Sequence, residues 1–221
     1  MRLLDLILPQ RCVVCDAAGE QLCAPCRDAL PRLGSPLCDR CGAPTAWPVA
    51  RCRECSGRRL AFVSARAAVA YDDGVRRLVR SWKERGLRSL AATAADAIAE
   101  SLPPPTGASA LAFVPPDEAR GLQRGHHPAE RLALELGGRW SLPVLALLER
   151  TRPSARQRGL SLSDRRRNVS GAFAAARDPP PRVVLVDDVY TSGSTTSAAA
   201  GALRRRGARR VDVVTFARVV R

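Results

Sequence analysis

The sequence predicts an α/β protein: a mostly parallel sheet with helices on both faces, preceded by a small cysteine-rich module. Two observations lead to this prediction. Eight cysteines form four C-x-x-C pairs in the first quarter of the 221 residues, and helical and strand-like segments alternate through the rest. Such alternation is typical of a parallel sheet covered by helices. Because the composition changes near Gly57, we expect one unit over residues 1–57 and a second over residues 58–221.

The cysteine pairs predict two structural zinc sites. A two-residue spacer lets both sulfurs of a pair reach one tetrahedral ion, and eight thiolates complete two four-cysteine sites. Sequential use of the pairs is the simplest arrangement, and the spacing leaves an interleaved one open. Closed sites of this kind have no free position for catalysis and instead fold a segment with few apolar residues. The candidate ligands are Cys12, Cys15, Cys23, Cys26, Cys38, Cys41, Cys52 and Cys55.

A disulfide framework fits the same cysteines less well. It would be typical of a secreted chain, but the apolar stretch in residues 1–8 is broken by Asp5 and followed by Pro9. That stretch is too short for a secretory signal. No apolar run approaches the roughly 20 residues that a membrane-spanning helix needs. We therefore expect a cytoplasmic protein without a membrane span.

Helices and strands are expected in alternation after the cysteine-rich module. An amphipathic helix is predicted up to Gly86, because four apolar residues repeat there with helical spacing. They are Val75, Leu78, Val79 and Trp82. The other expected helices cover residues 88–102, 128–136 and 194–206, and the expected strands cover residues 111–114, 144–148, 172–174, 183–186 and 210–217.

The strand–turn–helix segment at residues 183–195 is the most informative for function. Its apolar residues predict a strand buried on both faces, Asp187 and Asp188 follow where that strand should end, and Gly193 lies in a hydroxyl-rich turn. The start of the next helix offers unpaired N–H groups and a positive dipole end to a phosphate. Carboxylates repel a bare anion, so they indicate a ligand that also carries hydroxyls or a divalent metal. An ordinary strand–turn–helix in an α/β core is the competing interpretation.

This segment resembles the motif of the type I phosphoribosyltransferases that binds phosphoribosyl pyrophosphate (PRPP). The resemblance implies that Asp187 and Asp188 bind the ribose hydroxyls, that the turn surrounds the 5′-phosphate and that Mg²⁺ accompanies the diphosphate. In catalysis, the two acids would act together with Arg124, which would stabilise the leaving pyrophosphate. The implied ligand contacts are Asp187, Asp188, Tyr190, Thr191, Ser192, Gly193, Ser194 and Thr195.

Two arginine-rich segments are further candidates for anion contacts. Arg120 and Arg124 follow an expected strand, and loops after parallel strands gather at the edge where ligands bind. Residues 151–168 are expected to form a long polar loop that contains Arg156 and Arg158. All four guanidinium groups are suited to pyrophosphate or DNA. Solvated basic loops are the competing interpretation.

The overall charge indicates a polyanionic partner. The formal net charge is +15 at pH 7, which favours attraction to nucleic acid. Aromatic residues make up only 4% of the chain, so platforms on which single-stranded bases would stack are not evident. Single-stranded DNA is therefore a plausible partner whose binding surface the sequence does not locate.

The chain as a whole resembles the ComF family of double-zinc-ribbon, phosphoribosyltransferase-like proteins. The resemblance rests on segments that follow one another in order and end with the acid pair and its turn. They are the cysteine pairs in residues 6–26 and 38–55, Tyr71 with Lys83 and Gly86, Val114-Pro115, Arg124-Gly125, Arg152 with Gln157, and residues 167–173. The sequence departs from the family at His126-His127, where an aromatic residue and Asn are usual, and at Pro116.

The resemblance implies a protein that binds PRPP with Mg²⁺ and handles internalised single-stranded DNA during natural transformation. Two alternatives stay open. One is an active PRPP-dependent phosphoribosyltransferase with an unknown acceptor, and the other is a zinc-ribbon adaptor that docks on a helicase-type competence protein. The chain ends just after its last expected strand, so we expect no C-terminal hood over a base. This favours a binding site over nucleotide synthesis.

Overall fold

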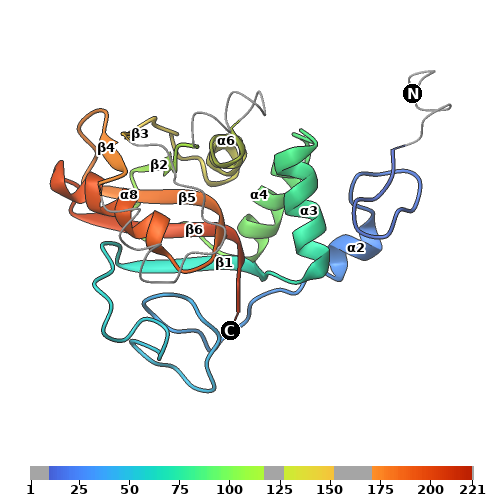
Figure 1. Ribbon diagram of the computed structural model, residues 1–221, viewed down its shortest axis with the longest axis horizontal. Helices are drawn as coiled ribbons and strands as arrows, with labels where there is room; N and C mark the ends of the chain where they lie inside the picture. The colour runs from blue at the N-terminus through green and yellow to red at the C-terminus, as the bar shows by residue number, and fades with distance from the viewer. Residues whose placement is uncertain (1–9, 117–126, 152–170, 221) are drawn as a thin grey trace.

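A four-stranded parallel sheet forms the centre of the computed structural model, which describes residues 10–116, 127–151 and 171–220 (Figure 1). The strand order is β1–β6–β5–β2, and every pair in it is parallel. This confirms the predicted α/β class. The strands are β1 (Ser64–Ala70), β2 (Ala110–Phe113), β5 (Arg182–Tyr190) and β6 (Arg210–Arg218).

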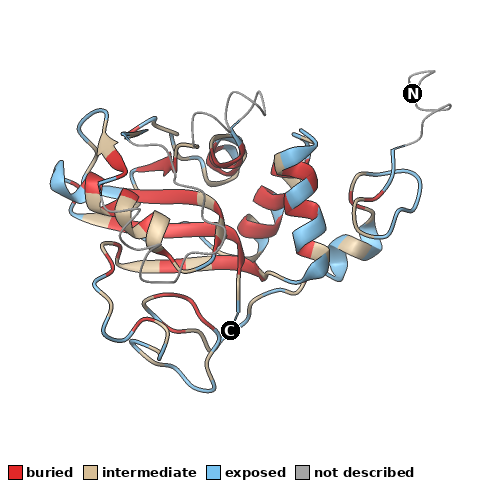
Figure 2. Ribbon diagram, viewed as in Figure 1, coloured by how far each residue is buried: buried red, intermediate tan, exposed pale blue. Residues whose placement is uncertain are grey.

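Helices cover both faces of this sheet, because the central strands are apolar on both sides. In β5, Val184 and Val186 pack into one hydrophobic cluster, whereas Val183 and Leu185 pack into the other. The first cluster includes residues of three helices, α3 (Asp73–Glu84), α4 (Leu90–Ser101) and α6 (Pro128–Trp140). The second includes α8 (Ser194–Arg205). Figure 2 shows buried residues along the strands and the inner faces of the helices.

The predicted helices are confirmed, with small shifts at their ends. Asp72 caps α3, since its side chain accepts a hydrogen bond from the Val75 N–H at 2.8 Å. The helix α6 begins at Pro128 as expected but continues four residues past the expected end, to Trp140, where Ser141 adopts a left-handed conformation. A left-handed residue after a helix is a common way to end it.

The strand predicted at residues 144–148 is wrong. Val144 makes a single parallel bridge to Leu111, and the strand β3 covers Leu148–Arg150 instead. Pro143 precedes the bridge and has no N–H to donate, which limits a ladder beside β2. The strand β3 pairs antiparallel with β4 (Phe173–Ala175) in a separate two-stranded sheet.

Two further differences concern strand boundaries. The strand β1 is not expected from its own residues, Ser-Ala-Arg-Ala-Ala-Val-Ala, because alanine predominates and has a low strand propensity. The strand β5 also runs through the two acids to Tyr190 rather than ending before them. Its pairing with β2 stops at Val186, but its pairing with β6 continues as far as Arg218.

The two cysteine clusters pack against different parts of the α/β unit. The first, with the short helix α2 (Ala24–Asp28), contributes Cys12 to the cluster that contains α3. The second contributes Cys38, Cys41 and Cys55 to the cluster that contains α8. In Figure 1 the first segment lies beside α3 and the second below β1. Within the described residues, no helix is long and apolar enough to cross a membrane.

Candidate functional site

In the structure, four cysteine sulfurs lie close together at each of the two predicted zinc sites. The Sγ atoms of Cys12, Cys15, Cys23 and Cys26 lie within 4.8 Å of one another, and so do those of Cys38, Cys41, Cys52 and Cys55. Neighbouring sulfurs in these clusters are 3.5 to 3.6 Å apart. A tetrahedral zinc ion with bonds of about 2.3 Å needs sulfur–sulfur edges of about 3.8 Å. The residues therefore fit two zinc ions, and the cysteine pairs are used sequentially.

The second cysteine cluster is the more deeply buried one. Cys38 and Cys55 are both fully buried, whereas Cys15 of the first cluster is exposed. Cys38 Sγ accepts a hydrogen bond from the Cys52 N–H at 3.2 Å. Burial tends to raise the pKa of the Cys38 thiol, but nearby backbone N–H groups outweigh burial and lower this pKa to about 7. Such N–H groups favour the thiolate, which is the form that binds zinc.

The two acids of β5 have different environments. Asp188 is 9% exposed, and its Oδ2 lies 2.6 Å from the Lys83 ammonium of α3. Asp187 is half-buried, and its Oδ1 accepts a hydrogen bond from the Asp188 N–H at 2.9 Å. Burial, followed by the charge of Asp188, raises the pKa of Asp187 to about 7. One acid is thus held as an ion pair, and the other can change protonation near neutral pH.

The turn after β5 presents the start of α8. Gly193 is the N-cap and adopts a left-handed conformation with φ of 71°, and within the described residues no side chain caps the helix. Ser192 Oγ and Ser194 Oγ lie 3.0 Å apart, and the Ser194 N–H reaches Ser192 Oγ only at 3.4 Å. Thr191 is exposed at the tip. Backbone N–H groups at an uncapped helix start can bind a phosphate.

Tyr190 lies beneath this turn. Its side chain is buried, with 3% of the residue exposed, and burial raises the pKa of its hydroxyl to about 12. A Cβ atom added at Gly193 would overlap the Tyr190 hydroxyl and ring. Glycine at position 193 is therefore required both by the left-handed backbone and by the space that the ring occupies.

Two basic residues that were not expected as site residues act on the acids through their charges. Lys83 is the only lysine in the chain, and this is the sequence signal that could have identified it as a site residue. The charge of Arg150 in β3 partly offsets the effects that raise the pKa of Asp187. The Arg150 side chain donates a hydrogen bond to the Pro116 carbonyl at 3.2 Å, and its guanidinium lies 4.6 Å from the centroid of the Phe173 ring. The expected anion contacts Arg120, Arg124, Arg156 and Arg158 lie outside the described residues.

A basic cleft of about 420 Å³ runs along α8. Ser194, Ser197 and Arg205 line its helical side, and Arg58 and Arg59 line the side formed by the segment after the second cysteine cluster. The Ala61 N–H donates to Ser197 Oγ at 3.0 Å, which ties that segment to the helix. The cleft therefore shares Ser194 with the turn after β5.

A comparison with known protein families agrees with the zinc sites. Residues 3–56 match the family described as the double zinc ribbon domain. No curated protein matches the sequence. The chain is thus an α/β protein with an N-terminal zinc-ribbon region that holds two four-cysteine sites.

Several solved structures are similar to this chain, and two of them are described here. Glutamine PRPP amidotransferase from B. subtilis, in complex with ADP and GMP, is 22% identical with a TM-score of 0.41, and the match covers 58% of this chain. The match spans only 26% of the amidotransferase chain. Orotate phosphoribosyltransferase from Aeropyrum pernix is 26% identical with a TM-score of 0.36, over 67% of each chain.

Proposed function

We propose that this protein binds PRPP, or a related phosphoribosyl ligand, together with Mg²⁺ at the end of β5. One observation carries the proposal: Asp187 and Asp188 lie near the end of β5, and the uncapped start of α8 follows that strand after a short turn. Acceptors for hydroxyls or a metal therefore lie three to eight residues along the chain from backbone donors that suit a phosphate, and a phosphorylated sugar carries groups for both.

Each part of the ligand has a counterpart in the site. The hydroxyls and N–H groups of residues 191–195 would bind the 5′-phosphate, and the two acids would bind the ribose hydroxyls. Mg²⁺ favours oxygen ligands and would bridge the diphosphate. Arg124, with the other candidate arginines, would contact the pyrophosphate. Lys83 neutralises Asp188, which reduces the repulsion that two adjacent carboxylates would exert on an anionic ligand.

The biological setting extends this proposal. We propose that residues 1–57 form a zinc-ribbon unit on a phosphoribosyltransferase-like unit, and that the protein acts in the cytoplasm on incoming single-stranded DNA during natural transformation. Docking of the zinc ribbons on a helicase-type protein belongs to the same setting. Transfer of the phosphoribosyl group to an acceptor is a separate activity, which the binding site alone does not require.

Calorimetry with PRPP and Mg²⁺ tests the proposed binding. We expect Asp187→Asn and Asp188→Asn each to weaken binding at least about tenfold, because each removes a charged acceptor. Asp178→Asn is the matched control, since its side chain is 82% exposed in an ion pair with Arg206. The absence of measurable binding by the unmodified protein, or binding by both acid variants as tight as that of the unmodified protein, would rule out the proposal.

A second candidate function, contact with single-stranded nucleic acid, is favoured by Trp47. This side chain is 68% exposed, the largest value among the exposed large apolar residues of the described chain. It lines a cleft of about 400 Å³ together with Arg51 and Arg53. An exposed indole beside guanidinium groups suits base stacking with phosphate contacts. The low aromatic content of the sequence had given no sign of such a surface.

Titration of an oligonucleotide measured by fluorescence anisotropy tests this second function. Trp47→Ala should weaken binding by roughly 1–3 kcal/mol through lost stacking. Leu134→Ala removes another exposed apolar side chain, 49% exposed, and should leave the affinity unchanged. Equal affinities for the Trp47 variant and the unmodified protein would show that this surface is not a base-stacking site.

A further inference from the structure

The buried guanidinium of Arg218 connects the second cysteine cluster to the end of β5. Only 1% of the residue is exposed. Its Nη1 donates to the Cys41 carbonyl at 2.6 Å, and its Nη2 lies 2.6 Å from the Glu54 carboxylate and 3.8 Å from Cys41 Sγ. Cys41 is a candidate zinc ligand, and Glu54 lies between the candidate ligands Cys52 and Cys55. The partners of this buried charge thus belong to the second zinc site.

The other side of the same guanidinium contacts Tyr190. The Arg218 Cζ atom lies 4.7 Å from the centroid of the Tyr190 ring, in a cation–π arrangement. The two residues are also register partners in the β5–β6 ladder. Phe62 also contacts Tyr190, and the two rings form an edge-to-face pair with their centroids 6.3 Å apart. The position of the tyrosine ring is therefore set by Arg218 and Phe62 together.

The tyrosine ring in turn supports the turn that begins α8. Its hydroxyl and ring lie against Gly193 so closely that a single added carbon would overlap them. Gly193 is the N-cap, so its position fixes the direction of the first N–H groups of the helix. A continuous series of contacts thus joins the second zinc site to the proposed phosphate-binding turn.

We propose that Arg218 is a positioning residue that makes the conformation of residues 191–197 depend on the second zinc site. A buried cation is stable only while its partners stay in place. With zinc bound, Cys41 and Glu54 hold the guanidinium beneath Tyr190, and the ring holds Gly193. When zinc leaves this site, Arg218 loses its fixed partners and the turn loses its support. The effect on ligand binding rests on the proposed function, whereas the effect on the turn does not.

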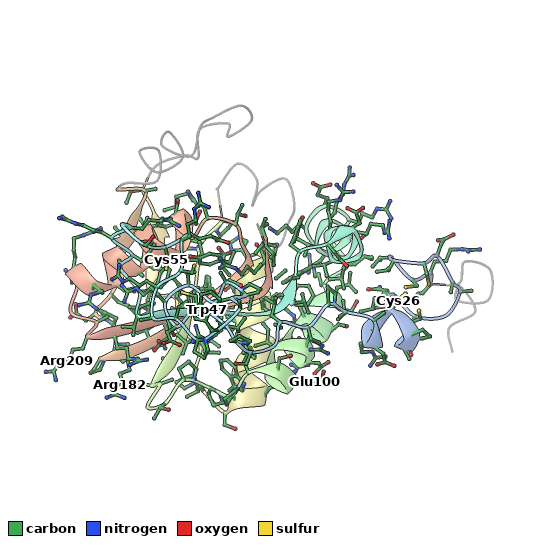
Figure 3. All side chains as sticks on the ribbon, turned by 90° about the horizontal axis from the view of Figure 1, so that it is seen from below. Cys26, Trp47, Cys55, Glu100, Arg182 and Arg209 are labelled. Carbon is green, nitrogen blue, oxygen red and sulfur yellow. The ribbon has the colours of Figure 1, made fainter. Side chains whose placement is uncertain are left out.

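The two zinc sites pack into different parts of the protein, so the proposal predicts a different effect for the loss of each zinc ion. The first cluster packs into the other hydrophobic cluster of the protein, with α3. Figure 3 shows Cys26, a residue of α2, on the other side of the molecule from Cys55. Loss of zinc from the first site should therefore leave residues 191–197 unaffected. If the loss of zinc only loosened the whole protein, its loss from either site would affect residues 191–197 to the same extent.

Hydrogen–deuterium exchange measured by mass spectrometry on the full chain tests the coupling. In Arg218→Met, with zinc content measured in parallel, we expect exchange in residues 191–197 to rise at least about tenfold while exchange in α6 stays unchanged. Cys55→Ser should raise exchange in the same residues, and Cys26→Ser should not. Unchanged exchange in Arg218→Met, or an equal rise in both cysteine variants, would overturn the proposal.

A milder variant and a ligand measurement complete the test. Glu54→Gln removes the charged partner of Arg218 but no zinc ligand, so it decides the question if Arg218→Met does not fold. It should also raise exchange in residues 191–197, and no rise would overturn the proposal. The affinity for PRPP with Mg²⁺ should fall at least about fivefold in the variants that loosen the turn. If the unmodified protein binds no PRPP, the proposed function fails, but the exchange data still decide the coupling.

Discussion

Asp187 is the residue whose chemistry the fold alters most clearly near neutral pH. Burial and the charge of Asp188 raise its pKa to about 7, while Lys83 and Arg150 act in the opposite direction. An unfolded chain would lose this proton near pH 4. Between these two values the folded protein binds a proton that the unfolded protein has lost, so stability falls as the pH rises and levels off above about 7.

Replacing Asp187 with Asn should remove this contribution. We expect the fall in stability between about pH 4 and pH 7 to become shallower, and the variant to be more stable than the unmodified protein at pH 8 by roughly 1–3 kcal/mol. Urea unfolding at several pH values measures both quantities. Parallel stability profiles for the two proteins would show that Asp187 ionises normally in the fold.

The same protonation predicts how ligand affinity depends on pH. A metal or a ribose hydroxyl needs the carboxylate of Asp187 as an acceptor, so binding of PRPP with Mg²⁺ should release a proton below about pH 7. The affinity should rise by up to about tenfold per pH unit below that value and level off above it. Calorimetry in buffers of different ionisation enthalpy counts the released proton. An affinity independent of pH between 5.5 and 8 would contradict this role for Asp187.

At the scale of one element, the start of α8 depends on contacts beneath it. Gly193 and Gly86 share nearly the same backbone conformation, with φ of 71° and 68°. A Cβ at Gly193 would meet the Tyr190 ring, whereas one at Gly86 would meet nothing within 4 Å. The two positions therefore separate the cost of a left-handed backbone from the cost of crowding.

Gly193→Ala should destabilise the protein more than Gly86→Ala. The left-handed conformation alone costs about 1 kcal/mol when alanine replaces glycine, and crowding in a packed region adds roughly 1–3 kcal/mol. Chemical denaturation of both variants gives the difference directly. Equal losses of stability would mean that the Tyr190 ring moves aside without cost and does not fix the turn.

Local sequence signals were sufficient for elements that are stabilised locally. The helix α3 has a regular apolar repeat, and its end was predicted near Gly86, two residues past the observed end at Glu84. The strand features that the sequence did not predict are those that depend on pairing with distant segments. The strand β1 forms because β6 lies beside it, and β5 continues past Asp188 for the same reason. Neither partner can be identified from the strand's own residues.

The candidate site likewise combines features that one segment of the sequence predicts with contacts between distant residues that it does not predict. The acids, the turn and Gly193 lie within one segment, so their types and spacing were visible in the sequence. The ion pair of Asp188 with Lys83 joins residues about a hundred positions apart, and Arg218 reaches Cys41 across 177 positions. No spacing rule covers such contacts. They arise only when the sheet brings β5, β6 and the second cysteine cluster together.

For the whole molecule, the two zinc sites are integral parts of the packing rather than an appendage. The cysteines of the second site contribute to the same hydrophobic cluster as Leu185 and Ala199, and Cys12 contributes to the other. Structural zinc sites contribute on the order of 10 kcal/mol to folding of their segments. Removal of zinc should therefore disturb both layers of the protein.

Metal analysis tests this view of the molecule. The purified protein should contain two zinc ions per chain, and a strong chelator should lower its melting temperature by at least about 10 °C. Added zinc should restore the melting temperature, whereas added Mg²⁺ should not, because thiolates are poor ligands for magnesium. A zinc-free protein with an unchanged melting temperature would contradict the assignment of the eight cysteines.

A crystal structure with PRPP and Mg²⁺ bound is the most direct test of the proposed binding site, because it locates every part of the ligand. We expect the 5′-phosphate to lie against the backbone N–H groups of residues 191–195 and the ribose hydroxyls to lie within hydrogen-bonding distance of Asp187 and Asp188. Ligand density elsewhere, for example in the basic cleft along α8 with the turn at residues 191–195 empty, would contradict it.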